Sequence, residues 1–524
     1  MTCRPRMKMV LLVILHEKDK HMSTVSDSTL AGAPVEVTDL RSALKLLEGI
    51  PGQLLRTAHP VDPNAELAGV YRHIGAGCPV VPPTKIGPAM LFENVKGYSG
   101  ARIVTGVMAS RARVAHLFGT TPEKVTFKLM EAIDKAIAPV VSKAEVPACQ
   151  QVVYKQDIDI LKVVPAPTNT PEDAGPFFTM GLLRATDPET GESDVTIHRL
   201  CVQSKDEISV FFAPGRHIDA FRQKAEKMGK ALPVTINIGL DPAVYIAACF
   251  EPPTTPQGCD ELSIAGGWRG KAIELAKGVS VDEYAIANAE VVIEGEILPG
   301  VRVREDQNSN TGHAMPEFPG YNGPANPSLN VIKVKAITTR KNPILETVSG
   351  PGEEHVNLAG IPTEASIFRM VNNAMPGRLQ NVYAHSSGGG KFLAILQFKK
   401  SIPADEGRQR QAALIALAVY SELKNVIVVD EDVDIFDTND VLWAMQTRYQ
   451  GNKSTIFIPG VIGHVLDPSQ SPEYSNEIIQ RGTSCKTIFD CTVPWPVKEH
   501  FKRAQFLDVD PTPFLVPSSK PMEL

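Results

Sequence analysis

The chain has 524 residues, of which 43% are hydrophobic and 21% charged, and its mean hydropathy is -0.07. These proportions are typical of globular proteins and argue against a membrane protein, while the length predicts two or three domains. The net charge of -6 and the pI near 6.1 provide no basic surface for nucleic acid, so a small-molecule substrate is expected.

Residues 1–37 are expected to form a disordered extension. A basic start precedes a short apolar run at 9–15, which is too short to span a bilayer and is followed by charged residues without a small-residue cleavage site. The segment therefore indicates an extension or an upstream start codon, with Met22 as a candidate start, and an export signal is the alternative. The eight cysteines contain no CxxC pair, which favours a reducing, cytoplasmic location over a disulfide framework.

Residues 38–150 are predicted to form an N-terminal α/β domain. Leu40, Leu44 and Leu47 recur at helical spacing, and Asp39 precedes them as a candidate N-cap. The runs PAMLFENVKGY and ARIVTGVMA indicate strands, and a second helix is expected to begin near Pro122.

Residues 151–345 change to short β-rich runs separated by Pro, Gly and Asp. The runs are QVVYK, VTIHRLCVQ, ISVFFAP, VTINIGL, AVYIAACF, AEVVIEGEI and NVIKVKAITT. This pattern predicts a closed or sandwiched antiparallel sheet, which we expect to be the catalytic domain.

Residues 346–495 return to alternating strands and helices and predict a C-terminal α/β domain. The strands are expected in GGGKFLAILQFKK and NVIVVD, and the helices in GRQRQAALIALAVYSEL and TNDVLWAMQTRY. Residues 496–524 are Pro-rich without periodicity, which indicates an extended arm or a partner contact.

Three segments of the middle domain carry polar residues that a half-buried strand does not need. They are Asp194, His198 and Arg199 in DVTIHRL, Arg216 and His217 in APGRHI, and Asp260 and Glu261 in GCDELSI. One imidazole and two carboxylates would suit manganese, iron or zinc and would leave coordination positions open. Taken singly, these residues also fit a hydrogen-bonded loop histidine, a solvated helix start and a structural ion pair.

A second polar cluster follows a predicted strand and contains Glu305, Asp306, His313 and Glu317. Two glutamates near one arginine would allow a proton relay, because the arginine keeps one carboxylate ionised while burial raises the pKa of the other. The alternative is a plain polar loop.

Two other segments invite a ligand reading. In GGGKF, Phe392 stands where a nucleotide triphosphate loop needs Ser or Thr, so Lys391 could contact a single phosphate or lie in a hairpin turn. The acidic run DEDVDIFDTND lacks the Gly and Glu spacing of an EF-hand and predicts a solvated turn with a helix cap.

The order of these motifs resembles the UbiD family of reversible aromatic and acrylic acid decarboxylases. The likeness covers about residues 40–448 and includes PAMLFENVKGY, PTNTPEDAGPFFTMG, IHRLCVQ, DELSIAGGWRG, EFPGYNG and VVDEDVDIFDTNDVLWAMQTR. It implies an α+β multi-domain fold in which a split β-barrel middle domain binds prenylated flavin mononucleotide and an α/β C-terminal domain mediates oligomerisation. The family uses a divalent metal, usually Mn²⁺, at the flavin phosphate, with K⁺ nearby.

The resemblance also assigns roles to residues of this chain. The metal ligands fall on Asp194, where the family commonly has Asn, and on His217 and Glu261. The catalytic trio falls on Arg199, Glu305 and Glu317, and the two glutamates are twelve positions apart where the family usually separates them by five. Flavin contacts fall on Ile197, Arg199, Arg216, His217 and Lys391.

The segment HAMPEFPGY looks more like gallate and protocatechuate decarboxylases than like members acting on acrylic acids. The expected reaction is therefore the reversible, non-oxidative decarboxylation of a hydroxylated aromatic acid to the phenol and CO2. His313 is a candidate to take a phenolic proton. A flavin prenyltransferase would supply the cofactor, and the assembly would be a homodimer or homohexamer.

Three alternatives stay open on the sequence alone. The first is a cinnamic, acrylic or heteroaromatic acid decarboxylase of the same family. The second is a flavin-free metal hydrolase that uses Asp194, His217 and Glu261. The third is a non-catalytic subunit of a carboxylase complex.

Overall fold

The structure is a computed structural model that describes residues 36–78, 81, 85–212, 215–256, 258–470 and 482–515. The extension expected at 1–37 lies outside these residues, apart from its last two positions. Within the described ranges, no helix is both long and apolar enough to cross a bilayer.

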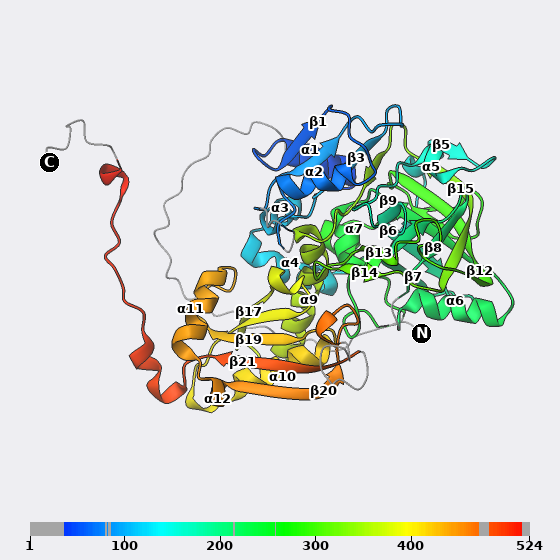
Figure 1. Cartoon of the computed structure of the whole chain (residues 1–524). Helices are drawn as coiled ribbons and strands as arrows, with labels where there is room; N and C mark the ends of the chain where they lie inside the picture. The colour runs from blue at the N-terminus through cyan, green and yellow to red at the C-terminus, as the bar shows by residue number, and fades with distance from the viewer. Residues whose placement is uncertain are drawn as a thin grey trace. The chain divides into compact units, whose positions relative to one another are not determined.

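The first layer contains a small four-stranded sheet with helices around it (Figure 1). Its order is β1 (Leu54–Thr57), β2 (Ala89–Phe92), β3 (Arg102–Thr105) and β16 (Ile344–Glu346), so its last strand comes from far along the chain. Its helices are α1 (Leu40–Glu48), α2 (Glu66–Ile74), α3 (Arg111–Leu117) and α4 (Val125–Asp134). Asp39 accepts a hydrogen bond from the backbone N–H of Ser42, which confirms the predicted cap of α1.

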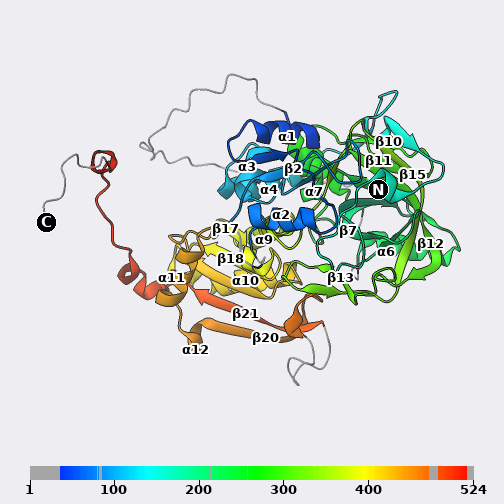
Figure 2. The same cartoon turned by 45° about the horizontal axis from the view of Figure 1, so that its top comes forward.

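The middle of the chain forms a closed, six-stranded antiparallel barrel (Figures 1 and 2). The strand order is β12 (Val291–Val303), β9 (Leu232–Ile238), β6 (Phe177–Thr186), β7 (Ser193–Val202), β8 (Glu207–Val210) and β15 (Leu329–Thr339). Pairing of β15 with β12 closes the barrel, and β5 (Val152–Tyr154) adds to the outside of β15. Closure leaves fewer unpaired strand edges. The barrel, together with the flanking helices, confirms the predicted α+β fold with a split barrel.

Further elements flank the barrel. The helices are α5 (Ile160–Val163), α6 (His217–Lys227), α7 (Pro242–Ala247) and α8 (Glu261–Arg269), and α6 packs against β6, β7, β9 and β12. The strands are β4 (Val140–Val141), β10 (Glu274–Lys277), β11 (Tyr284–Ile286), β13 (His313–Pro316) and β14 (Asn322–Pro324).

The strand predicted in AVYIAACF is wrong, because this run forms α7. Asp241 caps the helix through the N–H of Ala243, and Pro242 occupies its first turn. All six residues of α7 are buried, so the run has no polar face that would reveal a helical period.

The C-terminal part contains a five-stranded sheet with buried residues on both faces. The strand order is β17 (Leu379–Ala384), β18 (Leu393–Phe398), β19 (Asn425–Asp430), β21 (Thr483–Cys491) and β20 (Thr455–Ile462). Val426 and Val428 of β19 face a cluster with α9 (Glu353–Ala374) and α10 (Arg408–Val419). Ile427 and Val429 face the cluster that includes α11 (Thr438–Arg448), which explains the continuous apolar run.

The remaining helices are short. They are α12 (Gly451–Ser454) and the 3₁₀ turns η1 (Pro122–Lys124), η2 (Ala148–Gln150), η3 (Ser386–Gly388), η4 (Pro403–Asp405), η5 (Pro468–Gln470), η6 (Trp495–Phe501) and η7 (Thr512–Phe514). Beyond η6, the side chain of Arg503 pairs with Asp432 and Asp440, and residues 504–515 are all exposed (Figure 1).

Candidate active site

Three of the sequence-predicted residues converge at the edge of the barrel. Asp194 lies near the start of β7, His217 is the first residue of α6 and Glu261 is the first residue of α8. Their ligand atoms all lie within 4.8 Å of one another, and His217 Nδ1 is 3.1 Å from Asp194 Oδ1. Two helix starts and one strand therefore bring together residues that are far apart in sequence.

This cluster has the chemistry of a divalent metal site. Asp194 and Glu261 are buried, and Glu261 Oε2 has no hydrogen-bond partner among the described residues. Burial and the nearby carboxylate of Asp194 raise the pKa of Glu261 well above its usual range. A cation would offset this repulsion, and one imidazole with two carboxylates fits Mn²⁺, Fe²⁺ or Zn²⁺ with positions left for another ligand.

A second group forms around Arg199, which lies on β7 five positions after Asp194. Its Nη2 donates to Glu305 Oε2 at 2.8 Å, and its Nη1 donates to Glu317 Oε1 at 2.5 Å. The separation of the two glutamates by twelve positions thus does not prevent both from reaching one guanidinium. Glu317 begins the turn of the hairpin that β13 forms with β14.

Glu305 is held more rigidly than Glu317. The Glu305 side chain is 1% exposed, accepts the backbone N–H of Asn326, and has its own carbonyl held by the Gln203 amide. The Glu317 side chain is 14% exposed. Burial raises the pKa of Glu317 above its usual range, and the positive charge of Arg199 only partly offsets this. Glu317 is therefore the better carrier of a transferable proton.

The residues predicted to contact a flavin are spread around this pair of clusters. Ile197 lies between them on β7 and is half-buried. Arg216 immediately precedes α6 and pairs with Glu251 at 2.6 Å, whereas Lys391 pairs with Glu422 at 2.9 Å. Each cation is balanced by a carboxylate rather than buried alone, and each could also bind an anionic group of a ligand.

A group of residues that the sequence did not single out surrounds Lys391. The Phe318 ring stacks near His355, Phe392 and His464, and Lys391 Nζ lies 5.8 Å from its centroid. Burial and Lys391 lower the pKa of His355 to about 3 and that of His464 to about 4, so both imidazoles are neutral near pH 7. Their positions in different segments gave no local motif that could have found them.

Lys391 itself is cationic. Burial lowers its pKa, but the carboxylate of Glu422 outweighs burial and the net pKa is raised. The same pairing lowers the pKa of Glu422 to about 2 despite burial. A fixed cation beside two neutral imidazoles can bind oxygen atoms of a phenol or a phosphate.

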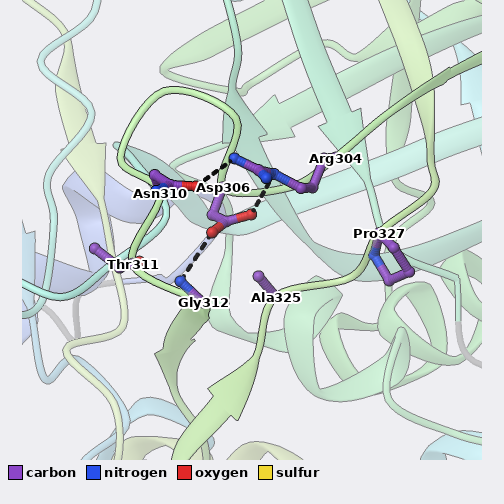
Figure 3. Close-up of a pocket in the computed structure, with 7 residues that line it drawn as sticks. All are labelled: Arg304, Asp306, Asn310, Thr311, Gly312, Ala325 and Pro327. Atoms are coloured by element: carbon purple, nitrogen blue, oxygen red, sulfur yellow. Dashed lines mark hydrogen bonds and ion pairs between the residues drawn. The ribbon is translucent and has the colours of Figure 1, made fainter.

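His313 does not join the trio. Its side chain is 42% exposed, and its Nε2 lies 4.0 Å from Glu172 Oε2. The segment before it lines a surface pocket of about 380 Å³ together with Ala325 and Pro327 (Figure 3). In that pocket Asp306 accepts from Gly312 N–H and pairs with Arg304, so the inserted loop is braced internally.

Comparison with known families gives matches in chain order. The models of 3-octaprenyl-4-hydroxybenzoate carboxy-lyase match with the N-terminal domain at residues 48–133, the UbiD Rift-related domain at 140–353 and the C-terminal domain at 356–491. Gallate decarboxylase from Lactiplantibacillus plantarum is 52% identical over 477 residues, which is 90% of this chain and 97% of the relative.

Solved structures agree with these matches. The apo 3,4-dihydroxybenzoic acid decarboxylase from Enterobacter cloacae has 63% identity and a TM-score of 0.88, over 92% of this chain and 99% of that one. An evolved dimeric form of a UbiD-class enzyme from Pelotomaculum thermopropionicum, in complex with prenylated FMN, has 32% identity and a TM-score of 0.76. It covers 90% of this chain and 97% of its own.

Proposed function

The chain belongs to the UbiD family of carboxy-lyases, and on that premise we propose that it removes CO2, without oxidation, from a hydroxylated aromatic acid of the gallate or protocatechuate type. The relatives named gallate decarboxylase and 3,4-dihydroxybenzoic acid decarboxylase, at 52% and 63% identity, support this substrate class. They favour it over the acrylic and heteroaromatic alternatives.

The observation that carries the proposal is the position of Arg199 between two glutamates. It lies on the same strand as the metal ligand Asp194, so a substrate held at Arg199 would lie beside whatever group the metal site holds. This arrangement supports the assignment of Arg199, Glu305 and Glu317 as the catalytic residues.

The cofactor we propose is prenylated FMN, as in the Pelotomaculum enzyme. Asp194, His217 and Glu261 would hold a divalent metal, Mn²⁺ in the proposal, at the flavin phosphate, with K⁺ nearby. Ile197 and Arg216 would contact the flavin, whereas Lys391, which the resemblance assigns to the flavin, is assigned below to the substrate. When bound, the modified flavin supplies an electron sink for the bond to the carboxyl carbon.

The protein residues orient the acid and handle the proton. Arg199 can offer a terminal N–H to the substrate carboxylate while the other keeps one glutamate ionised. Glu317, whose pKa burial raises, would in its protonated form deliver a proton to the ring carbon that loses CO2. The product phenol then carries hydrogen at that carbon, and Glu317 is reprotonated from water.

The cluster around Lys391 supports a hydroxylated ring. Lys391 and the neutral imidazoles of His355 and His464 can bind phenolic oxygens, which an acrylic side chain does not offer. This reading places Lys391 at the substrate instead of the flavin, and the two roles are separable by experiment.

We also propose a homodimer or homohexamer in the cytoplasm, with a flavin prenyltransferase as supplier of the cofactor. The Pelotomaculum relative with bound prenylated FMN is an evolved dimeric form. Phe506 and Leu507 of the arm are 94% and 85% exposed, and such exposed apolar surface is unfavourable in a monomer. Six of the described cysteines form no disulfide, which suits a reducing compartment; they are Cys78, Cys149, Cys201, Cys249, Cys485 and Cys491.

The deciding experiment compares protein made with and without a flavin prenyltransferase. We expect a flavin absorption band, bound metal and CO2 release from gallate or 3,4-dihydroxybenzoate only with the prenyltransferase. Equal CO2 release from both preparations would refute the cofactor assignment, and bound metal without a flavin band or CO2 release would favour the flavin-free hydrolase. Bound flavin without CO2 release from any aromatic acid would favour a non-catalytic subunit.

A further inference from the structure

Phe211 lies directly beneath the guanidinium of Arg199. The guanidinium carbon is 4.4 Å from the centroid of the Phe211 ring, well within the roughly 6 Å over which a cation and an aromatic face attract each other. Phe211 is half-buried and follows β8. It lies outside the metal ligands, the trio and the cluster around Lys391.

The register of the barrel explains this contact. Strands β7 and β8 are antiparallel, with Leu200 opposite Val210 and Cys201 opposite Ser209. One further step in the same register puts Arg199 opposite Phe211, and the next puts His198 opposite Phe212. The Phe212 ring does meet His198, with centroids 4.8 Å apart in a T-shaped arrangement. Successive side chains point to opposite faces, so the two phenylalanines serve different faces of the sheet.

Arg199 binds both carboxylates only if the plane of its guanidinium keeps one orientation. Its two terminal nitrogens reach two different carboxylates, and its Nε has no partner among the described residues. Without a third anchor the whole guanidinium plane can turn about the Cδ–Nε bond and lose one carboxylate. A ring stacked on one face restricts that rotation and leaves the other face open to substrate, because guanidinium groups stack on aromatic faces.

We propose that Phe211 is a positioning residue of the decarboxylation, a π-platform that holds Arg199 so that one guanidinium binds Glu305 and Glu317 together. This role rests on the proposed function of the trio. The contact between Phe211 and Arg199 itself does not depend on that function.

Loss of the stacked Phe211 ring should change the pH dependence of turnover, which a general loss of packing would not do. If Arg199 turns away from Glu317, the carboxyl loses the cation that partly offsets its burial, and its pKa rises further. Turnover falls with rising pH as Glu317 loses its proton, and this limb of the pH profile should then move to higher pH. A purely structural defect would lower turnover without moving that limb.

The test compares Phe211→Leu, Phe211→Tyr and Phe212→Leu in flavin-loaded enzyme. Phe211→Leu keeps an apolar side chain but removes the π-face, so kcat should fall about 10- to 100-fold and the limb should shift upwards. Phe211→Tyr keeps the face and should stay within about threefold of the parent in kcat. Phe212→Leu is the matched control: it removes the neighbouring ring from the opposite face and should leave the limb unchanged.

Two further measurements make the outcome decisive. In a Glu317→Gln background, Phe211→Leu should add almost no further loss, because residues that act as one unit are not additive. Crystal structures of Phe211→Leu should show Arg199 turned away from at least one glutamate, a readout that needs no turnover. An unchanged Arg199, additive losses, or loss of flavin with an unmoved limb would each overturn the proposal. If the parent decarboxylates no aromatic acid but the crystal structures show the turn, the proposed function fails and the platform stands.

Discussion

His217 Nδ1 lies 3.1 Å from Asp194 Oδ1, although the two residues are 23 positions apart in the chain. The contact joins the start of α6 to β7, and the start of α8 brings Glu261 to the same point. In the absence of a cation, two buried carboxylates at one point repel each other. The geometry therefore leads directly to a prediction about metal content.

His217→Ala and Glu261→Ala should each lose bound divalent metal, with flavin content falling in parallel. Each substitution removes one of three protein ligands, and the ion would link the protein to the flavin phosphate. Elemental analysis and the flavin absorption band measure the two losses. His313→Ala is the control, because this exposed histidine lies outside the cluster and should keep parental metal. Parental stoichiometry in the two ligand variants would refute the ligand set.

Lys391→Met should raise KM for 3,4-dihydroxybenzoate by about tenfold or more, because it removes a charged hydrogen bond to a ring oxygen. Flavin content should change little. Lys424→Met is a matched control, since Lys424 pairs with Asp467 at 2.8 Å in another part of the same domain. Loss of flavin at unchanged KM would instead assign Lys391 to the cofactor.

The double substitution of Phe506 and Leu507 by Asp should shift the protein to smaller assemblies. Arg503 holds the start of the arm to its own domain, because it pairs with Asp432 and stacks on Trp443 at 3.9 Å, whereas residues 504–515 are exposed. Light scattering during size exclusion measures the mass. The neighbouring Gln505→Asp adds charge without removing apolar surface and should leave the assembly unchanged. A parental mass in the double variant would show that the arm does not join subunits.

Glu353 predicts a pH dependence of stability. Burial raises the pKa of this 7% exposed carboxyl from about 4.5 to about 7, so the folded state binds a proton that the unfolded state has released. Stability should therefore fall as pH rises through the window from about 4.5 to 7, by at most about 3 kcal/mol. Glu353→Gln should remove this contribution.

Thermal midpoints between pH 5 and 8 measure that effect. The parent should lose more than the Gln variant as pH increases. Glu354→Gln is less informative, because Glu354 accepts the N–H groups of Gly106 and Met108 and the amide cannot replace both contacts. Parallel curves for the parent and Glu353→Gln would contradict the prediction.

Local rules accounted for much of the fold. The cap at Asp39, the strands of the barrel and the helix at 438–448 each had a signal within a few residues. The rules failed where every position is buried. The run that forms α7 has no polar face, and α9 is buried along most of its 22 residues, so neither shows the period that marks a surface helix.

The residues of the site likewise fall into those that local sequence could predict and those that only tertiary packing brings together. Asp194 and Arg199 share one strand, and a shared strand fixes their spacing without tertiary information. His355 and His464 belong to separate segments and meet only around Phe318, so their partnership depends on the packing of the C-terminal sheet. Glu305 and Glu317, twelve positions apart, likewise meet only through the guanidinium of Arg199, which their spacing did not predict.

Glu317→Gln separates proton transfer from binding. The amide keeps the size and one acceptor oxygen for Arg199 but has no transferable proton, so turnover should fall by a factor of about 100 to 10,000. Flavin and metal should remain at parental levels, because Glu317 is not among the metal ligands. Turnover in heavy water adds a second measurement: the parent should place deuterium at the ring carbon that lost CO2.

His313→Gln is the matched control, because it lies on the same hairpin but its side chain is partly exposed to solvent, and it should keep near-parental turnover. If Glu317→Gln retained more than about a tenth of parental turnover, well inside the expected loss, another group would deliver the proton. The neutral imidazole of His355 or His464 would then be the next group to replace, since both surround Phe318, the residue after Glu317.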